Sequence, residues 1–94
     1  MNLVATEFFS EQVSELDEKS KRIVKEKILL IKQNPFRYKR IYSKKFSRVH
    51  RVWVNIENRV SRLVYVISGD TVQLMCLIDR SKDYKDLEKF LGNL

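Results

Sequence analysis

The sequence predicts an α+β domain in which an N-terminal strand and a helical hairpin pack on an antiparallel β-sheet, with a short C-terminal helix. Two patterns predict this class. Apolar residues keep a helical period up to residue 31, and from residue 48 they form short Val- and Ile-rich runs between turn residues. The 94 residues suffice for one hydrophobic core, and two Gly with one Pro leave no room for a flexible linker. Residues 1–94 are therefore expected to form a single domain.

The N-terminal third is predicted to hold a strand and two helices. Residues 2–6 form the candidate strand, and Thr6 can cap the helix that follows it. Asp17 is a plausible N-cap for a second helix, which Asn34-Pro35 ends. In each helix apolar side chains recur on one face, which predicts an antiparallel hairpin with that face toward a core. These rows are Phe9, Val13 and Leu16 in the first helix, and Val24, Ile28 and Ile31 in the second.

The rest of the chain is predicted to supply the sheet. Residues 36–47 are basic and aromatic without a clean period, which indicates an irregular segment or an edge strand. Three strands follow, and the turn Asn55–Asn58 between the first two looks longer than usual. Residues 82–91 fit a last helix, with Gly92 past its end. The expected strands are Arg48–Asn55, Arg59–Ile67 and Thr71–Ile78.

The last hairpin is centred on Gly69-Asp70, and a two-residue turn there sets which side chains share a face. One face is expected to be wholly apolar and to pack on the helices, with Cys76 as an inert core residue. The other face is partly apolar and is expected to stay open, so Arg62 on it should be exposed. The expected pairs are Ile67/Val72, Tyr65/Leu74 and Leu63/Cys76 on the first face, and Val66/Gln73, Val64/Met75 and Arg62/Leu77 on the second.

The strand before this hairpin is expected to place two more side chains beside Arg62. Its valines have the parity of the core, which puts Arg51 and Trp53 on the opposite face. His50 has the core parity, so we expect a packed histidine and not a catalytic one. Arginine can bind phosphate through its bidentate fork, and Trp53 could stack a base or close the edge of the core.

Positive charge is concentrated in one block of the chain. The formal net charge is +7, and residues 37–62 hold nine basic residues against Glu57 alone, whereas both flanks mix the two signs. Such a block is the footprint expected for a polyanion partner, and a solubilising surface is the alternative. We expect RNA contacts from Lys44, Lys45, Arg48, Trp53 and Arg59.

Several classes of site and location are disfavoured. One Cys and one His cannot form an internal disulfide or a metal-binding cluster, so no metal and no cofactor is expected, and a reducing cytoplasm fits. The apolar runs are too short to span a membrane, and the N-terminus lacks the basic start and cleavage site of a signal peptide. The expected location is therefore the cytoplasm, with no membrane partner.

The order of elements, the length and one local pattern together resemble the RelE/ParE toxin superfamily. A basic strand precedes RLVYVISGDTVQLMCLI, and an arginine and a downstream tyrosine follow it. The resemblance implies the toxin of a toxin–antitoxin pair, and its RelE-like branch implies a ribosome-dependent mRNA endonuclease. The metal-free reaction would be attack by an RNA 2′-hydroxyl on its own phosphodiester, and the partners would be an antitoxin protein, the ribosome and mRNA. The catalytic residues that the resemblance implies are Arg62, Arg80, Tyr84 and Arg51.

Two alternatives remain open. A toxin of the ParE type inhibits a topoisomerase through protein contacts, and a small basic nucleic-acid-binding module has no toxicity at all. The chain departs from the family pattern at Asp79, where many members carry a histidine before the C-terminal arginine. An anion therefore stands where a proton donor or a phosphate contact is wanted.

Overall fold

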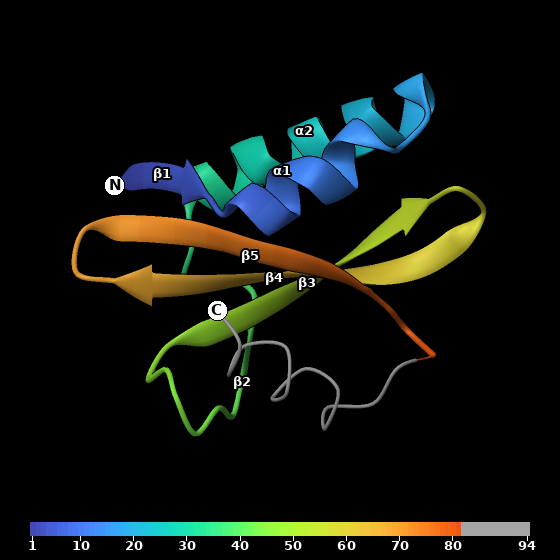
Figure 1. Ribbon diagram of the computed structural model, residues 1–94. Coiled ribbons are helices and arrows are strands. Elements are labelled where there is room, and N and C mark those ends of the chain that lie inside the picture. Colours follow the sequence, from blue (N-terminus) through green and yellow to red (C-terminus); the bar gives the residue numbers. More distant parts are fainter. Residues whose placement is uncertain (82–94) are drawn as a thin grey trace.

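The structure is a computed structural model that describes residues 1–81. Within this range two helices pack on a five-stranded sheet of order β1-β5-β4-β3-β2, which confirms the α+β class (Figure 1). The helix expected over residues 82–91 and the candidate residue Tyr84 lie outside the described residues. The elements are β1 (Asn2–Ala5), α1 (Glu7–Ser14), α2 (Glu18–Gln33), β2 (Lys39–Ile41), β3 (Val49–Ile56), β4 (Arg59–Ser68) and β5 (Thr71–Asp79).

The sheet is mixed, not antiparallel as the sequence predicted, because β1 pairs parallel to β5. Asn2 aligns with Thr71, and the other neighbouring strands pair antiparallel. β2 is an edge strand, one of the two structures expected for residues 36–47. Strands joined by a tight turn must be antiparallel, whereas β1 and β5 lie far apart in the chain and no local pattern specifies the direction of their pairing.

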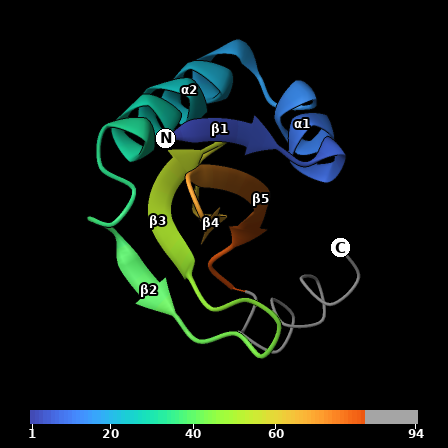
Figure 2. The same cartoon turned by 90° about the vertical axis from the view of Figure 1, so that its left-hand side faces the viewer.

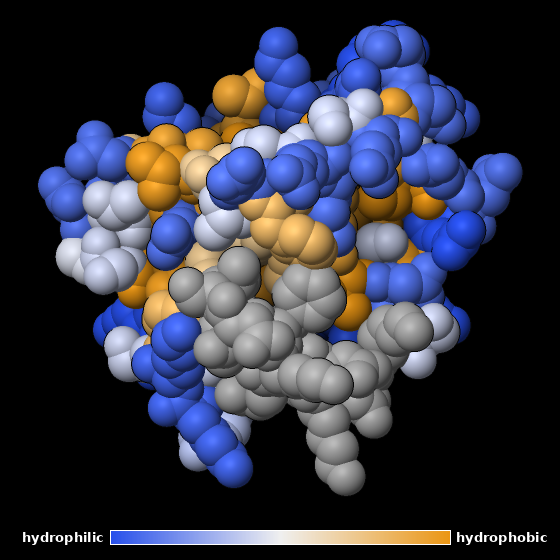
Figure 3. All heavy atoms as spheres, viewed as in Figure 1, coloured by the Kyte–Doolittle hydropathy of each residue, from blue (hydrophilic) through white to orange (hydrophobic). Residues whose placement is uncertain are grey.

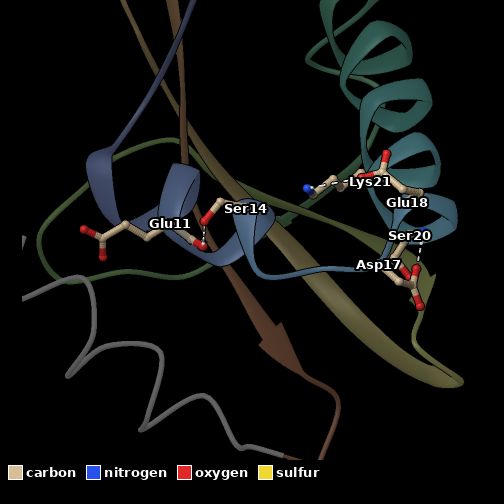
Figure 4. Close-up of polar contacts among 6 residues, drawn as sticks. All are labelled: Glu11, Ser14, Asp17, Glu18, Ser20 and Lys21. Carbon is tan, nitrogen blue, oxygen red and sulfur yellow. Dashed lines mark hydrogen bonds and ion pairs between the residues drawn. The ribbon is translucent and has the colours of Figure 1, made fainter.

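Both helices begin at the side chains that the sequence predicted as caps. Thr6 Oγ1 accepts a hydrogen bond from Phe9 N–H at 3.0 Å, and Asp17 Oδ1 accepts one from Ser20 N–H at 2.7 Å (Figure 4). The bond from the Ser20 backbone stabilises the carboxylate and holds the pKa of Asp17 below its usual value. α2 returns along the sheet in the opposite sense to α1, and both helices lie on one side of the curved sheet (Figures 1 and 2).

One hydrophobic core lies between the helices and the sheet. Its buried members are Phe9, Val24, Ile31, Val52, Val54, Ile56, Leu63, Tyr65, Ile67, Val72, Leu74 and Leu77. His50 belongs to the same face of the sheet, is 3% exposed and stacks on Tyr65 with 5.4 Å between ring centroids. Its Nδ1 lies 2.9 Å from the Tyr38 carbonyl oxygen, which orients the ring. His50 is therefore the packed histidine that its parity predicted.

α1 also covers the part of the β5 edge that lies beyond the end of β1. Thr6 Oγ1 donates to the Met75 carbonyl at 2.8 Å. Further along, the Gln12 carboxamide donates to the Leu77 carbonyl at 2.8 Å and accepts from Leu77 N–H at 2.7 Å. These side chains thus replace the hydrogen bonds of a neighbouring strand along this edge of β5. The backbone groups that they bind are not open for pairing with another chain.

The connection between β3 and β4 is a two-residue turn, so the expectation of a longer turn is wrong. Ile56 pairs with Arg59, and Glu57 and Asn58 have φ values of 50° and 62°. Positive φ at both positions is the requirement of a type I′ turn, which favours Asn-Gly, so a glutamate gives little sequence signal for it. Ser20 Oγ accepts a hydrogen bond from Glu57 N–H at 3.0 Å and ties the turn to α2.

A β-bulge shifts the register of the last hairpin. Close to the Gly69-Asp70 turn, the expected pairs Ile67/Val72, Val66/Gln73 and Tyr65/Leu74 are present. The register shifts between Val64 and Tyr65, and the pairs beyond the shift are Val64/Cys76, Leu63/Leu77 and Arg62/Ile78. The expected pairs Leu63/Cys76, Val64/Met75 and Arg62/Leu77 are therefore wrong by one residue, because a turn sets the register only as far as the first bulge.

The second face of the sheet is buried, not open as the sequence predicted. A second hydrophobic cluster lies there, made of Val49, Val64, Val66, Met75, Cys76 and Ile78. Partly buried Phe8, Ile41 and Phe46 pack against it from α1, β2 and the loop after β2. The bulge moves Cys76 from the expected helix-facing core to this cluster. Burial there raises the pKa of its thiol to about 12, so Cys76 is an inert thiol, as expected.

Candidate nucleic-acid interface

Strand pairing places three residues of the basic block on the second face of the sheet. Lys39 of β2 is the cross-strand partner of Arg51 on β3, and Trp53 is the partner of Arg62 on β4. Because Arg51 and Trp53 are two residues apart on one strand, all four side chains lie on the same face. The sequence prediction that Arg51, Trp53 and Arg62 share a face is therefore confirmed. Lys39 was missed because its segment has no strand periodicity.

Two arginines stack on Trp53. The Arg51 guanidinium carbon lies 4.2 Å from the centroid of the indole ring, and the Arg62 guanidinium carbon lies 5.5 Å from it. Both distances are within the range of cation–π attraction. Trp53 is a large hydrophobic residue, and it is 38% exposed to solvent. We call Arg51, Trp53 and Arg62 the arginine–tryptophan cluster.

Arg62 is buried, so the expectation that it is exposed is wrong. It is 7% exposed, and its Nη2 donates to the Arg80 carbonyl at 3.3 Å. Arg80 N–H in turn donates to the Val60 carbonyl at 2.9 Å, which holds the chain after β5 against β4. Burial follows from the apolar second cluster and the Trp53 ring beside Arg62, neither of which the parity of one hairpin reveals.

Arg51 is the more accessible arginine of the cluster. It is partly exposed and has no ion pair among residues 1–81, whereas Arg62 is 7% exposed. The buried Nε atoms of both arginines lack a hydrogen-bond partner among those residues. An anion that reached the exposed part of the Arg51 guanidinium would be bound favourably.

The candidate residues at the start of β4 and just after β5 are arranged differently from the cluster. Arg59 forms an ion pair with Asp79 at 3.8 Å, and Asp79 also accepts from Ser81 N–H at 2.8 Å. These residues and exposed Arg80 line one shallow hollow. Arg59 therefore has an internal counter-ion in Asp79. Tyr84 lies outside the described residues.

The remaining predicted RNA contacts lie on the loop between β2 and β3. Lys44, Lys45 and Arg48 are all exposed. The Lys45 ammonium lies 5.5 Å from the Phe46 ring centroid, and the Arg48 guanidinium lies 5.4 Å from the centroid of Phe36. Lys45 and Arg48 each lie over an aromatic ring that is close in the sequence. This part of the surface is therefore both basic and aromatic.

Residues 1–81 carry groups suited to binding a charged partner. Within residues 1–81, no three His, Cys, Asp or Glu side chains are grouped in a way that could hold a metal ion. No helix in that part of the chain is both long enough and apolar enough to cross a membrane. The arrangement can bind a polyanion through cations on Arg51 and Arg62 and offer an aromatic ring at Trp53.

Comparison with known proteins found no family model, curated protein or solved structure that matches this chain.

Proposed function

We propose that the protein is the toxin of a toxin–antitoxin pair and acts as a ribosome-dependent mRNA endonuclease of the RelE/ParE type. The observation that carries the proposal is the arginine–tryptophan cluster, in which Arg51 and Arg62 meet on one aromatic ring. It lies in a block of 26 residues with nine basic side chains and one acidic side chain. Electrostatic attraction of RNA and a fixed cationic centre for a phosphate are both consistent with this arrangement.

The proposed reaction needs cations more than any other group. The 2′-oxygen of one nucleotide attacks the adjacent phosphorus, and the bond from that phosphorus to the 5′-oxygen of the next nucleotide breaks. The products are a 2′,3′-cyclic phosphate and a 5′-hydroxyl, so one proton leaves the 2′-hydroxyl and one reaches the 5′-oxygen. Negative charge grows on the phosphoryl oxygens meanwhile, and guanidinium groups held in place stabilise it.

Each candidate residue has a distinct part in this proposal. Arg51 contacts a phosphoryl oxygen, since it is partly exposed and has no ion pair among residues 1–81. Arg62, stacked on Trp53 and bonded to the Arg80 carbonyl, is preorganised in a site of low exposure. The family resemblance assigns proton transfer to Tyr84 and a further phosphate contact to Arg80.

The test is single-turnover cleavage of mRNA on programmed ribosomes. Arg51→Ala should slow cleavage by about a hundredfold, the typical effect of losing one preorganised charge-stabilising group. Arg22→Ala is the matched control, because Arg22 is an exposed arginine on α2 and should cleave at the unaltered rate. Equal rates for the two variants would contradict the proposed site.

The basic loop supplies a test of RNA attraction that does not depend on cleavage. Binding to RNA or ribosomes should weaken steeply with salt, because each neutralised phosphate releases counterions. Charge reversal of Lys44 and Lys45 together should weaken binding further at low salt and leave the unfolding temperature unchanged. An affinity that does not change with salt concentration would indicate that the basic block only makes the surface soluble.

One observation favours a second candidate, a toxin that binds its target without cleaving RNA. Arg62 is only 7% exposed, and Asp79 stands close enough to Arg59 to pair with it. Both features limit the access of a phosphate to the arginines at this end of the sheet. Growth arrest without any mRNA cleavage would support this ParE-like candidate, and the absence of both activities would leave a basic nucleic-acid-binding module.

The partner in the proposal is an acidic antitoxin. An apolar groove of about 470 Å³ runs between α1, α2 and β1, lined by Phe9, Val13, Val24 and Ile28, among others, with Lys21 and Lys25 beside them. Apolar surface also gathers around the N-terminal strand (Figure 3). An amphipathic helix with acidic flanks would match the apolar lining of this groove and the charge of the two lysines beside it. We expect Lys25→Glu to weaken a complex with the acidic, helix-rich product of a neighbouring short reading frame.

A further inference from the structure

The loop after β2 presents an aromatic side chain to solvent. Tyr42 is 80% exposed, more than any other large hydrophobic residue among the described residues. Two other residues of this segment, Ile41 and Phe46, turn inward and pack against the second hydrophobic cluster. Tyr42 belongs to neither hydrophobic cluster of the described residues.

The loop that carries Tyr42 is held in one shape by its own hydrogen bonds. Ser43 Oγ accepts from the backbone N–H of Lys45 and of Phe46, each at 3.2 Å. Arg40 Nη2 donates to the Ser47 carbonyl, which closes the base of the loop. A ring displayed on a fixed loop loses little conformational entropy when a partner stacks on it.

The charge around Tyr42 has one sign. Residues 36–56 contain seven basic residues and no acidic residue. A hollow of about 470 Å³ adjoins the ring, and its walls mix polar and apolar atoms from Arg40, Ile41, Tyr42, Ser43, Phe46 and Ser47. An exposed aromatic ring flanked by cations along a chain is the arrangement that binds single-stranded nucleic acid, with bases on the ring and phosphates on the cations.

We propose that Tyr42 is a base-stacking residue for single-stranded RNA, with Arg40 and Lys44 or Lys45 contacting the phosphates on either side of the stacked nucleotide. The inference rests on the proposed function, and it adds a contact site separate from the arginine–tryptophan cluster. The exposed ring is what favours RNA over an acidic protein here, because a base can stack on it while the cations on either side contact phosphates.

The experiment measures the affinity of a labelled short single-stranded RNA by fluorescence anisotropy. Tyr42→Ala should raise Kd about tenfold, because stacking of one base on an aromatic ring contributes about 1–3 kcal/mol. Tyr42→Phe should bind as the unaltered protein does, since it keeps the ring. The dependence of log Kd on log salt should be the same in all three, because no cation changes.

Two further arms separate stacking from charge. An RNA probe that lacks one base at the stacked position should bind the unaltered protein more weakly. On this probe, Tyr42→Ala should have the same Kd as the unaltered protein. Replacing Lys44 and Lys45 by glutamine should reduce the salt slope by about 0.7, the value for one phosphate of a single strand.

The outcomes are distinguishable. Tyr42→Ala with unchanged affinity, or an equal loss on the probe without the base, would overturn the stacking role and leave the proposed function standing. If the unaltered protein does not bind RNA in this assay or cleave it on ribosomes, both the proposed function and the role of Tyr42 are wrong.

Discussion

Replacing Arg62 by alanine should destabilise the protein, although the sequence alone places this arginine on an exposed surface. Arg62 is 7% exposed in the structure, its guanidinium carbon lies 5.5 Å from the centroid of Trp53, and its Nη2 donates to the Arg80 carbonyl at 3.3 Å. The truncation removes both interactions and the buried stem of the side chain.

The magnitude follows from those interactions. Two buried methylenes of the stem contribute about 0.8 kcal/mol each. The stacking on Trp53 contributes about 1 kcal/mol, and the long hydrogen bond about as much. Removing a buried charge also recovers part of its desolvation cost, which opposes these losses. The net decrease in the free energy of unfolding should be about 2 kcal/mol, which lowers the Tm of a chain of this length by about 10 °C.

Urea unfolding followed by Trp53 fluorescence measures the effect, with thermal unfolding as a second probe. Arg59→Ala is the matched control, because the Arg59 side chain is 75% exposed and its ion pair with Asp79 spans 3.8 Å. Exposed pairs contribute at most about 1 kcal/mol, so this variant should unfold close to the unaltered protein. Arg62→Lys keeps the charge and most of the stem and should fall between the two.

The reasoning is refuted if Arg62→Ala unfolds within about 0.5 kcal/mol of the unaltered protein, which is the range of ordinary surface substitutions. A loss equal to that of Arg59→Ala would refute it as well, since burial is what distinguishes the two residues. The result also matters for function, because the cleavage rate of an Arg62 variant has meaning only at temperatures where it is folded.

Three further substitutions test the local structure. Thr6→Ala should cost about 1–2 kcal/mol, because Thr6 Oγ1 both caps α1 and donates to the Met75 carbonyl, and an unchanged urea midpoint would contradict this. Glu57→Asn should raise the free energy of unfolding by about 0.5–1 kcal/mol, since Glu57 has a φ of 50° and asparagine tolerates that conformation better; a destabilised variant would argue against the type I′ turn. Burial raises the pKa of Cys76 from 9.0 to about 12, so the unfolded chain loses this proton first and stability should fall by up to about 1.4 kcal/mol per pH unit between these values. Cys76→Ala should remove that share of the slope, and an identical pH profile for both proteins would show that the thiol is not buried.

Local chemistry was enough to predict most of the elements. Thr6 and Asp17 begin the two helices because a hydroxyl or carboxylate beside free backbone N–H groups is an N-cap wherever the sequence places it. Gly69-Asp70 begins a hairpin because glycine accepts the positive φ of 59° that the turn needs. The basic block was equally visible, since charge is a property of composition. These features depend on residues within a few positions of one another.

The candidate site was predictable only in part. Alternation along β3 and β4 put Arg51, Trp53 and Arg62 on one face, because side chains on a strand alternate whatever surrounds the sheet. It did not show that two guanidinium groups stack on one ring, or that β2 adds Lys39 beside Arg51. The sequence shows Tyr42 as an aromatic residue among cations. Only the structure shows that Tyr42 is exposed whereas Ile41 and Phe46 are packed.

By itself the sequence determined the types of most elements among residues 1–81, the caps, the turn at Gly69 and the position of the positive charge, because each of these follows from composition or from chemistry within a few residues. The tertiary structure alone decided that β1 runs parallel to β5, that a bulge after Val64 moves Cys76 to the second face, and that this face is buried around Arg62. Strand direction, bulges and burial depend on contacts between segments far apart in the chain. The free energy of those contacts is shared among many side chains, so no single stretch of sequence specifies them.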